Sequence, residues 1–524
     1  MVNDPRPLHS QRQSDNSAPF QLPINSPQVR PINPILSLSI LSRWSPMSPD
    51  PKPHAVLLAY PLQGHVTPQA HLAVNLAKRG FTITFINTHF IHHKTINSRR
   101  RRTHTQDADD DIFASVRQSD SLDIRYLVVS DGLPLNFDRS LNHDQYMAAL
   151  LHVFSAHVED ALIDIVSDDT RPPVTMLIAD TFFVFPATLA KRFGILYVSF
   201  WTEPALVFTL YYHLELLRQN CHFACNDVRE DRIDYIPGVK SIEPKDMPSY
   251  LQESDSASVV HQIIFKSFQE AKEADFVLCN TVQEMEPETI SGIQPKKPFY
   301  SIGPVFLAGS TKVATSLWSE SDCSRWLDSK PPGSVLYVSF GSYAHLAKQD
   351  LVEVAHGLLL SDVNFLWVLR PDIVSSEDTH PLPDGFESEA VDRGLVVQWC
   401  CQRKVLRHAA IGGFLTHCGW NSITESVWNR VPLLCFPLLT DQFTNRKLVV
   451  DDWKIGMNLL DRKYVVREHV CEKIKCLMGK ASGELYRNNA AELSKLMEGV
   501  WSSGGSSDKN MNRFVKDVKA RTQK

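Results

Sequence analysis

The sequence "GGFLTHCGWNSITES", Gly412 to Ser426, joins apolar strand-forming residues directly to small and polar ones. A buried strand that ends at His417 is followed by residue types typical of a turn and a helix start. In an open parallel sheet, ligands bind beyond the carboxyl ends of the strands. The stretch therefore predicts an α/β fold with a binding site at His417, and with Asn421 and Ser422 in the first turn of the next helix. Backbone N–H groups and the helix dipole there suit a phosphate.

The same alternation of apolar runs and helical stretches extends in both directions along the chain. Candidate strands in the first half cover residues 54–60, 81–87, 124–129, 174–179 and 195–200. Candidate strands in the second half cover residues 334–340, 364–370, 394–399, 411–417 and 431–437. Two such series predict two Rossmann-like domains whose parallel sheets face each other across a cleft.

The length of 524 residues exceeds what one hydrophobic core usually organises. We expect an N-terminal domain over 54–300, a linker over 301–320, a C-terminal domain over 321–500, and a helix over 501–524 that returns to the first domain. Residues 1–53 are rich in Pro, Ser, Asn and Gln, and Pro is too frequent for an amphipathic targeting helix. We expect a disordered extension or a gene-model artefact there, since translation from Met47 would give a compact protein.

Composition excludes several classes of partner. The net charge of -5 offers no electrostatic reason to bind nucleic acid or an anionic membrane. No apolar run approaches the roughly 20 residues that a membrane span needs. Ten cysteines without a C-x-x-C pair favour a reduced, cytoplasmic location.

Further residues around the opening stretch could complete a nucleotide-sugar site. Glu425 lies one helical turn past Asn421, where its carboxylate could accept hydrogen bonds from a ribose diol. Trp399 could stack on a base, while Asp441 and Gln442 could bind sugar hydroxyls. Each also has a structural interpretation: a core tryptophan, a helix cap, or an acid that complements the helix dipole. Together these residues would contact the base, the ribose, the diphosphate and the sugar of a nucleotide sugar, in that order.

The segment "PLQGHVTPQ" places His65 after the first strand, with Thr67 as a candidate N-cap and Pro68 at the first helical position. A helix amino terminus would keep the imidazole neutral and able to take a proton from an attacking hydroxyl. Asp180, at the end of the strand over 174–179, could hold the other ring nitrogen. The alternatives are a loop histidine without function and a helix-capping aspartate.

The 44 residues from Trp399 to Gln442 resemble the signature box of plant family 1 UDP-glycosyltransferases, the secondary-product glycosyltransferases. "FGS" at Phe340–Ser342 and "GGSS" at Gly504–Ser507 are similar to the family too. The resemblance implies a GT-B fold and metal-independent, inverting transfer of glucose from UDP-glucose to a hydroxyl of a small, largely apolar plant metabolite or hormone. It implies a monomer with no cofactor beyond the donor substrate. A non-catalytic nucleotide-sugar-binding protein, or the same chemistry with another UDP-sugar, remains the alternative.

The resemblance also assigns roles to single residues. In the nucleoside site, Trp399 would stack on uracil, the main chain of Cys401 with Gln402 would contact the base edge, and Glu425 would bind the ribose. For the diphosphate the assigned residues are Ser342, His417, Asn421 and Ser422. For the sugar they are Thr202, Trp420, Asp441 and Gln442. His65 and Asp180 match the catalytic pair.

The acceptor is not determined by these motifs. We expect its pocket within "FWTEPALVFTLYYHLELL", which begins at Phe200, and within 234–250. Phe208, Tyr211 and Tyr212 suit a flat, apolar acceptor, and they suit a helix core equally well. Glu203 stands where many relatives carry a smaller residue, so an acceptor cannot be transferred from the wider family.

Overall fold

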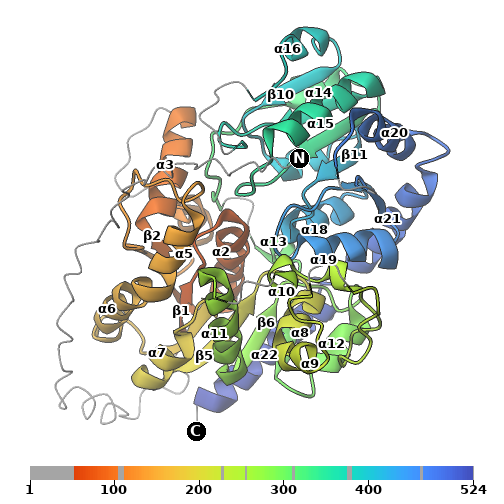
Figure 1. Cartoon of the computed structure of the whole chain (residues 1–524). Helices are drawn as coiled ribbons and strands as arrows, with labels where there is room; N and C mark the ends of the chain where they lie inside the picture. The colour runs from red at the N-terminus through yellow and green to blue at the C-terminus, as the bar shows by residue number, and fades with distance from the viewer. Residues whose placement is uncertain are drawn as a thin grey trace, which may run out of the picture. The chain divides into compact units, whose positions relative to one another are not determined.

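The computed structural model describes residues 52–103, 111–225, 229–253, 257–309, 313–374, 381–460 and 464–522. Met47 and almost all of the expected extension over 1–53 lie outside these residues. Lys52–Lys524 forms one compact unit, so the boundaries expected for separate domains stay predictions. Figure 1 labels many of the elements of this unit.

The first sheet has seven described strands, all parallel, in the order β3-β2-β1-β4-β5-β6-β7. Their bounds are β1 (His54–Leu58), β2 (Thr82–Thr88), β3 (Ile124–Val129), β4 (Val174–Asp180), β5 (Leu196–Trp201), β6 (Phe276–Cys279) and β7 (Phe299–Ser301). The strand order reverses direction between β1 and β4. Such a reversal opens a crevice at the carboxyl ends of the two strands, where ligands bind in this class of fold.

The second sheet has six described strands, also parallel, in the order β10-β9-β8-β11-β12-β13. Their bounds are β8 (Val335–Ser339), β9 (Asn364–Val368), β10 (Gly394–Val397), β11 (Ile411–Thr416), β12 (Leu433–Cys435) and β13 (Gly456–Asn458). Here the order reverses between β8 and β11. The predicted fold of two parallel α/β sheets is confirmed, and only the short strands β6, β7 and β13 lack a counterpart among the predicted runs.

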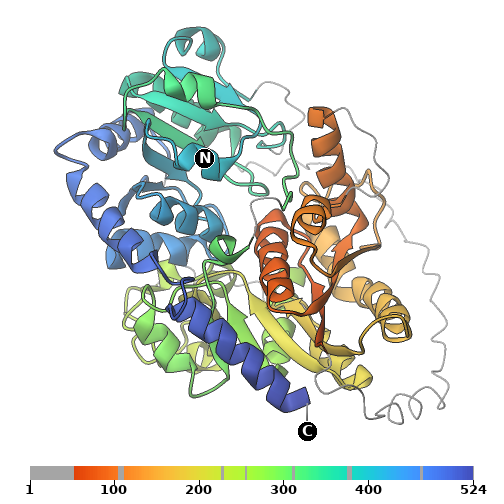
Figure 2. The same ribbon diagram turned by 180° about the vertical axis from the view of Figure 1, so that it is seen from behind.

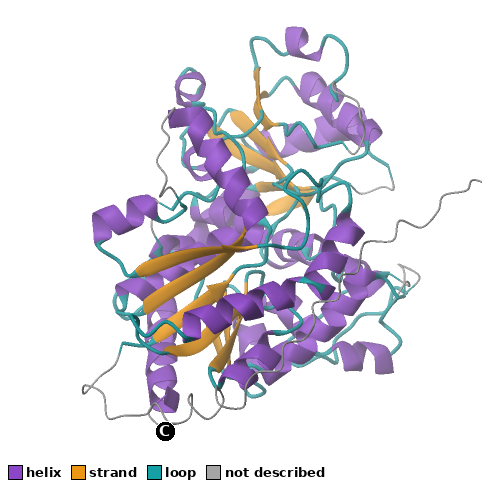
Figure 3. Cartoon of the chain, turned by 90° about the vertical axis from the view of Figure 1, so that its left-hand side faces the viewer, coloured by secondary structure: helices purple, strands orange, loops and turns teal. Residues whose placement is uncertain are grey.

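Helices join the strands and flank both sheets, as Figure 3 shows. In the first half they are α2 (Gln63–Lys78), α3 (His89–Thr103), α4 (Ala114–Asp120), α5 (His143–His152), α6 (Phe154–Val166), α7 (Pro186–Phe193), α8 (Ala205–Tyr212), α9 (Leu214–Gln219), η1 (Pro244–Asp246), α10 (Ser249–Gln252), α11 (Val259–Glu273), α12 (Pro287–Ile293) and α13 (Val305–Ala308). In the second half they are α14 (Ser324–Asp328), α15 (Lys348–Ser361), α16 (Phe386–Glu389), α17 (Gln402–Leu406), α18 (Trp420–Trp428), α19 (Gln442–Lys447), η2 (Leu448–Asp452), α20 (Arg467–Met478), α21 (Glu484–Met497) and α22 (Ser506–Thr522).

The first sheet is covered on both faces because alternate side chains of its strands point in opposite directions. Ala55 and Leu57 of β1 pack in one apolar cluster with α2 and α22, whereas Val56 and Leu58 pack with α5 and α6 in another. This explains why β1 is apolar along its whole length rather than at every second residue.

The last helix, α22, lies against the first sheet although it follows the second one in the sequence (Figure 2). The Tyr300 hydroxyl donates to the Asp517 carboxylate at 2.6 Å, and the rings of Phe276 and Phe514 lie 5.7 Å apart. Helix α13 lies within the segment expected to be a plain linker.

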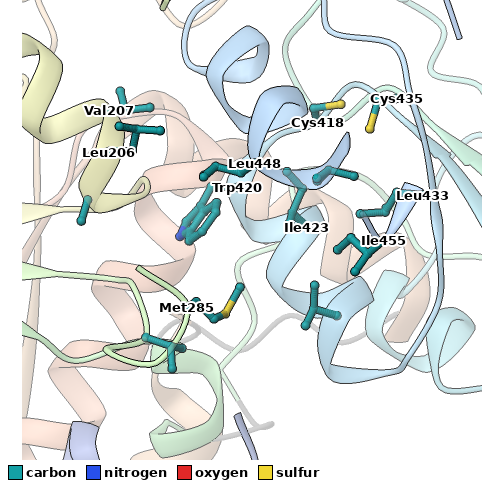
Figure 4. Close-up of a cluster of buried hydrophobic side chains, with 14 of the residues drawn as sticks. Leu206, Val207, Met285, Cys418, Trp420, Ile423, Leu433, Cys435, Leu448 and Ile455 are labelled. Atoms are coloured by element: carbon teal, nitrogen blue, oxygen red, sulfur yellow. The ribbon is translucent and has the colours of Figure 1, made fainter. Parts of the chain in front are cut away.

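The two sheets share one apolar cluster, shown in part in Figure 4. Trp420 and Ile423 of α18 pack there with Leu206 and Val207 of α8 and with Met285. A common core of this kind fixes the carboxyl edge of one sheet relative to the carboxyl edge of the other. In the described part of the chain, no helix is long and apolar enough to cross a membrane.

Candidate active site

A cavity of about 550 Å³ lies between the two sheets and is lined by residues that follow strands of both. Its walls include residues after β1 and β5 of the first sheet and after β8, β10 and β11 of the second. Both reversal points of the strand order therefore open onto one space. Its volume falls within the range of about 300 to 1,000 Å³ that small-molecule sites occupy.

His65 enters this cavity from the first turn of α2 rather than from the loop before a helix. The helix begins at Gln63, because the Leu62 carbonyl already accepts the N–H groups of His65 and Val66, both at 2.9 Å. The prediction of a helix capped by Thr67 is wrong, and that hydroxyl instead bonds to Thr315 at 2.8 Å. His65 thus belongs to the first turn of the helix, at its positive end.

Pro68 consequently lies inside α2 and not at its first position. Proline has no N–H, so the Gly64 carbonyl four residues earlier lacks its usual helical donor. The side-chain amide of Asn421 supplies that donor, with Nδ2 at 2.7 Å from the Gly64 oxygen. This hydrogen bond joins the first turn of α2 to the first turn of α18, across the cavity.

The His65 ring is oriented by two partners on one nitrogen. Nδ1 lies 2.8 Å from Oδ2 of Asp180 and 3.0 Å from the hydroxyl oxygen of Thr202. The other Asp180 oxygen accepts the N–H of Phe182 at 3.0 Å, and the Asp180 side chain is only 1% exposed. An aspartate that can only accept from Nδ1 places the proton there, which leaves Nε2 as the nitrogen able to take a proton in the cavity.

His417 follows β11 and fits between two glycines. A Cβ on Gly341 would lie 2.4 Å from Nε2 of His417, and one on Gly419 would lie 2.5 Å from it. The turn into α18 is made by Cys418, which adopts a left-handed backbone with φ of 67°. Burial, followed by the positive charge of Arg370, lowers the pKa of His417 from 6.5 to about 4. Near neutral pH the ring is therefore an uncharged hydrogen-bond partner.

Helix α18 presents its amino terminus to the cavity. Its N-cap is Gly419, and within the described residues no side chain caps it. The first-turn N–H groups, including those of Asn421 and Ser422, are thus available to an anion. Trp420, which the resemblance assigns to the sugar, is 3% exposed, and its indole donates from Nε1 to the Asn280 carbonyl at 2.8 Å. Its backbone remains at the cavity wall.

The residues predicted for the nucleoside form a connected network at the second sheet. Nε2 of Gln402 donates to Oε2 of Glu425 at 2.8 Å and to the Ser422 hydroxyl at 3.1 Å. The Gln402 side chain therefore orients Glu425 and is not free for a base edge, unlike the main chain of Cys401 at the start of α17. Burial raises the pKa of Glu425, and the bond from Gln402 opposes that rise. Trp399, half-buried, follows β10 and lines the same end of the cavity.

Asp441 and Gln442 lie at the start of α19, also in the cavity wall. The Gln442 amide oxygen accepts the N–H groups of Leu438 and Leu439 at 2.9 and 3.1 Å, so its NH₂ group is left for a ligand. Asp441 accepts from the Thr440 hydroxyl at 2.7 Å. Burial raises the pKa of Asp441, with Thr440 acting in the opposite direction.

The loop that carries Ser342 is braced by Arg370, which sequence reasoning missed. Its guanidinium is buried and donates to the carbonyls of Gly341 and Ala344, the latter at 2.7 Å. A cation directly after the apolar strand β9, one strand away from β8, is the signal that could have identified it. The neighbouring Tyr343 hydroxyl lies 2.6 Å from Nδ1 of His143 and links the loop to the first half of the chain.

The wall beside His65 is mostly apolar. It includes Tyr60, Met147, Phe182, Tyr250 and Ile263.

The expected acceptor residues Phe208 and Tyr211 are instead buried in the apolar cluster that the two sheets share, and Tyr212 packs against it. Helix α8 presents these side chains away from the cavity, so the core interpretation holds for them. Of the segment 234–250, Tyr250 does reach the cavity.

Two Rossmann-like sheets with a shared cavity at their carboxyl edges are the arrangement of the GT-B fold that the resemblance implied. The family model described as "UDP-glucoronosyl and UDP-glucosyl transferase" matches residues 306–499. UDP-glycosyltransferase 86A2 of Arabidopsis thaliana is 58% identical over 466 residues, which cover 88% of this chain and 94% of that protein. Linamarin synthase 1 of Manihot esculenta is 35% identical, over 90% of this chain and 98% of that protein.

A solved structure of Phytolacca americana UGT2, complexed with UDP-2fluoro-glucose and pterostilbene, is similar with a TM-score of 0.71. It is 28% identical and covers 90% of this chain and 100% of that one. The chain belongs to the UDP-glycosyltransferase family of plants, as the signature box predicted. It is accordingly an enzyme that transfers a sugar from a UDP-sugar to small plant acceptors.

Proposed function

We propose that the enzyme transfers glucose from UDP-glucose to a hydroxyl group of a small, largely apolar acceptor, with inversion at the anomeric carbon. The observation that carries this proposal is the His65–Asp180 contact of 2.8 Å beside an apolar wall and opposite the amino terminus of α18. Relatives named as glucosyltransferases support glucose as the sugar, among them the (R)-mandelonitrile beta-glucosyltransferase of Prunus dulcis, which is 34% identical.

In the proposed reaction, Nε2 of His65 accepts the proton of the acceptor hydroxyl while its oxygen bonds to the anomeric carbon. The bond from that carbon to the diphosphate breaks, and its electron pair leaves with UDP. One displacement reverses the configuration and needs no carboxylate nucleophile. Asp180 holds the imidazole tautomer and stabilises the imidazolium that forms.

The second half of the chain is proposed to hold the donor. Trp399 and the main chain of Cys401 take the uracil, Glu425 takes the ribose, and the amino terminus of α18 takes the diphosphate together with Ser342 and His417. N–H groups aimed at the leaving diphosphate stabilise the charge that develops on it. Residues at the other end of the cavity are proposed for the sugar: Thr202, the backbone of Trp420, Asp441 and Gln442. A cytoplasmic location and a monomeric state stay predictions.

A UDP-release assay tests the proposal, with UDP-glucose and a panel of phenols and terpenoid alcohols, with and without divalent metal. We expect release that depends on an acceptor, does not need the metal, and falls by a factor of about 100 to 10,000 in His65→Ala. Calorimetric binding of UDP should be unchanged in that variant. Binding of UDP-glucose without acceptor-dependent release across a broad panel would favour the non-catalytic alternative.

A further inference from the structure

Glu203 is a buried carboxyl at the cavity wall that the proposed mechanism does not use. It follows β5 and Thr202, at the carboxyl edge that also carries Asp180. Its side chain lines the cavity, and the residue is only 8% exposed. Oε2 has no hydrogen-bond partner in the part of the chain that the structure describes. A buried polar atom without a partner is costly, so a bound molecule is expected to satisfy it.

A nearby glutamate shows what a structural carboxyl looks like in the same region. Glu286 is also buried, but it accepts the N–H groups of Ala205 and Leu206 at 2.9 and 2.8 Å as well as the Thr281 hydroxyl. These bonds stabilise the start of α8. No comparable set of backbone donors surrounds the Glu203 carboxyl among the residues that the structure describes, so the role of Glu286 does not explain it.

The protonation state of Glu203 decides which ligand chemistry it suits. Burial raises the pKa of Glu203 well above the ordinary 4.5, and the carboxyls of Asp441 and Asp180 add to the rise. This rise favours the protonated acid, which offers one O–H donor and one carbonyl acceptor. An amine cation would need the ionised form, whereas an uncharged hydroxyl or carbonyl matches the neutral acid.

The neighbours of Glu203 indicate which part of the cavity a ligand atom bound to it would occupy. Asp441 belongs to the sugar end of the proposed donor site, and Asp180 belongs to the proposed catalytic pair. Tyr250, which contributes an aromatic ring, lines the same cavity. Glu203 therefore lies at the corner where a transferred sugar and an acceptor would meet.

We propose that Glu203 is a specificity-determining residue that binds an uncharged hydroxyl or carbonyl oxygen at the junction between sugar and acceptor. This inference rests on the proposed glucosyl transfer. The oxygen belongs either to the acceptor, beside its reacting hydroxyl, or to the donor sugar.

Two substitutions of the full-length protein separate a hydrogen-bonding role from a space-filling one. Glu203→Gln keeps the shape, the neutrality and both hydrogen-bonding functions, whereas Glu203→Leu keeps the approximate volume alone. Glu270→Gln is the matched control, because that half-buried carboxyl accepts the Ala187 N–H at 2.6 Å and does not line the cavity. Thermal unfolding and calorimetric UDP binding verify that each variant is folded.

The assay compares phenols that carry one hydroxyl with partners that carry a second hydroxyl or a carbonyl. If the oxygen is on the acceptor, Glu203→Leu lowers kcat/KM for the two-oxygen phenol about 10-fold or more relative to its one-oxygen partner. If it is on the sugar, KM for UDP-glucose rises about 10-fold in Glu203→Leu while UDP affinity is unchanged. Glu203→Gln and the control stay within about 3-fold in either case.

The inference is overturned if Glu203→Leu changes neither the acceptor ratio nor the KM for UDP-glucose by more than about twofold. Calorimetric binding of the phenol pairs to the UDP-loaded protein, and of UDP-glucose to the free protein, needs no turnover. Calorimetric binding therefore tests the role of Glu203 in ligand binding even if no acceptor is glucosylated. It separates failure of this inference from failure of the proposed function.

Discussion

Replacing Asp180 by asparagine should inactivate the enzyme more completely than replacing it by alanine. One Asp180 oxygen accepts the Phe182 N–H at 3.0 Å, and the other faces Nδ1 of His65 at 2.8 Å. In Asp180→Asn the amide oxygen must keep the bond from Phe182, because only oxygen can accept there. The NH₂ group then donates to Nδ1, the ring proton moves to Nε2, and Nε2 can no longer take the acceptor's proton.

The expected loss follows from removal of the general base. A positioned base contributes about 100 to 10,000-fold, and the same aspartate-to-asparagine change in a serine protease triad costs about 10,000-fold. We expect kcat to fall by roughly 1,000 to 10,000-fold, or about 4 to 5.5 kcal/mol in the barrier. In Asp180→Ala the Thr202 hydroxyl, 3.0 Å from Nδ1, can still accept the ring proton. That variant should keep the tautomer and remain about 10-fold more active than the asparagine variant.

Single-turnover and steady-state UDP release at saturating substrates measure these rates. UDP affinity serves as the control and should change by less than about twofold, because Asp180 lies behind His65 and outside the cavity wall. An asparagine variant that retains more than about a tenth of the wild-type kcat, or one more active than the alanine variant, would refute the tautomer argument.

Three further outcomes follow from the geometry. Glu425→Gln replaces the carboxylate that Gln402 orients, so the calorimetric Kd for UDP should rise by about 10 to 100-fold while binding of inorganic diphosphate is unchanged. Equal losses of affinity for both ligands would contradict the ribose assignment. Gly419→Ala places a Cβ 2.5 Å from Nε2 of His417, so UDP-glucose should bind about 10-fold or more weakly, and unaltered binding would show that the ring can move freely. Burial lowers the pKa of His71 from 6.5 to about 3, so the unfolded chain takes a proton that the folded chain resists, and stability falls as pH drops from 6.5 toward 3. Between pH 7 and pH 4.5, the free energy of unfolding in urea should fall by roughly 2 to 3 kcal/mol less in His71→Phe than in the wild type. An equal fall in both proteins would argue against His71 as the origin of this acid sensitivity.

The sequence alone determined the fold class, and most of the residues that it proposed for the donor line one cavity of the structure. Buried parallel strands are apolar along their whole length, so runs such as the one that begins at His54 can be recognised without any tertiary information. The site residues after these strands can be recognised too, because the carboxyl ends of parallel strands meet at one edge. The short strands β6, β7 and β13 carry too few residues to show such a pattern, and their pairing depends on neighbours far away in the sequence.

The tertiary structure decided which atoms of these residues are available. Local capping preferences predicted that Thr67 caps the first helix. The helix begins earlier, because the Leu62 carbonyl accepts its first N–H groups, and the Thr67 hydroxyl bonds to Thr315, which lies beyond the first sheet in the sequence. Trp420 and Gln402 both line the cavity, yet their side chains form hydrogen bonds inside the protein, with Asn280 and with Glu425.

Long-range contacts of this kind leave no local trace in a sequence. The same holds for Phe208 and Tyr211, whose aromatic character suits a ligand or a core and is resolved only by the direction in which α8 packs. For Glu203 the sequence showed an unusual residue, and only the packing around it showed a buried carboxyl in the cavity wall, one oxygen of which has no partner among the described residues. Residue type and the positions of the longer buried strands are encoded locally, whereas burial, tautomer and hydrogen-bond partners are set by elements that meet only in the folded chain.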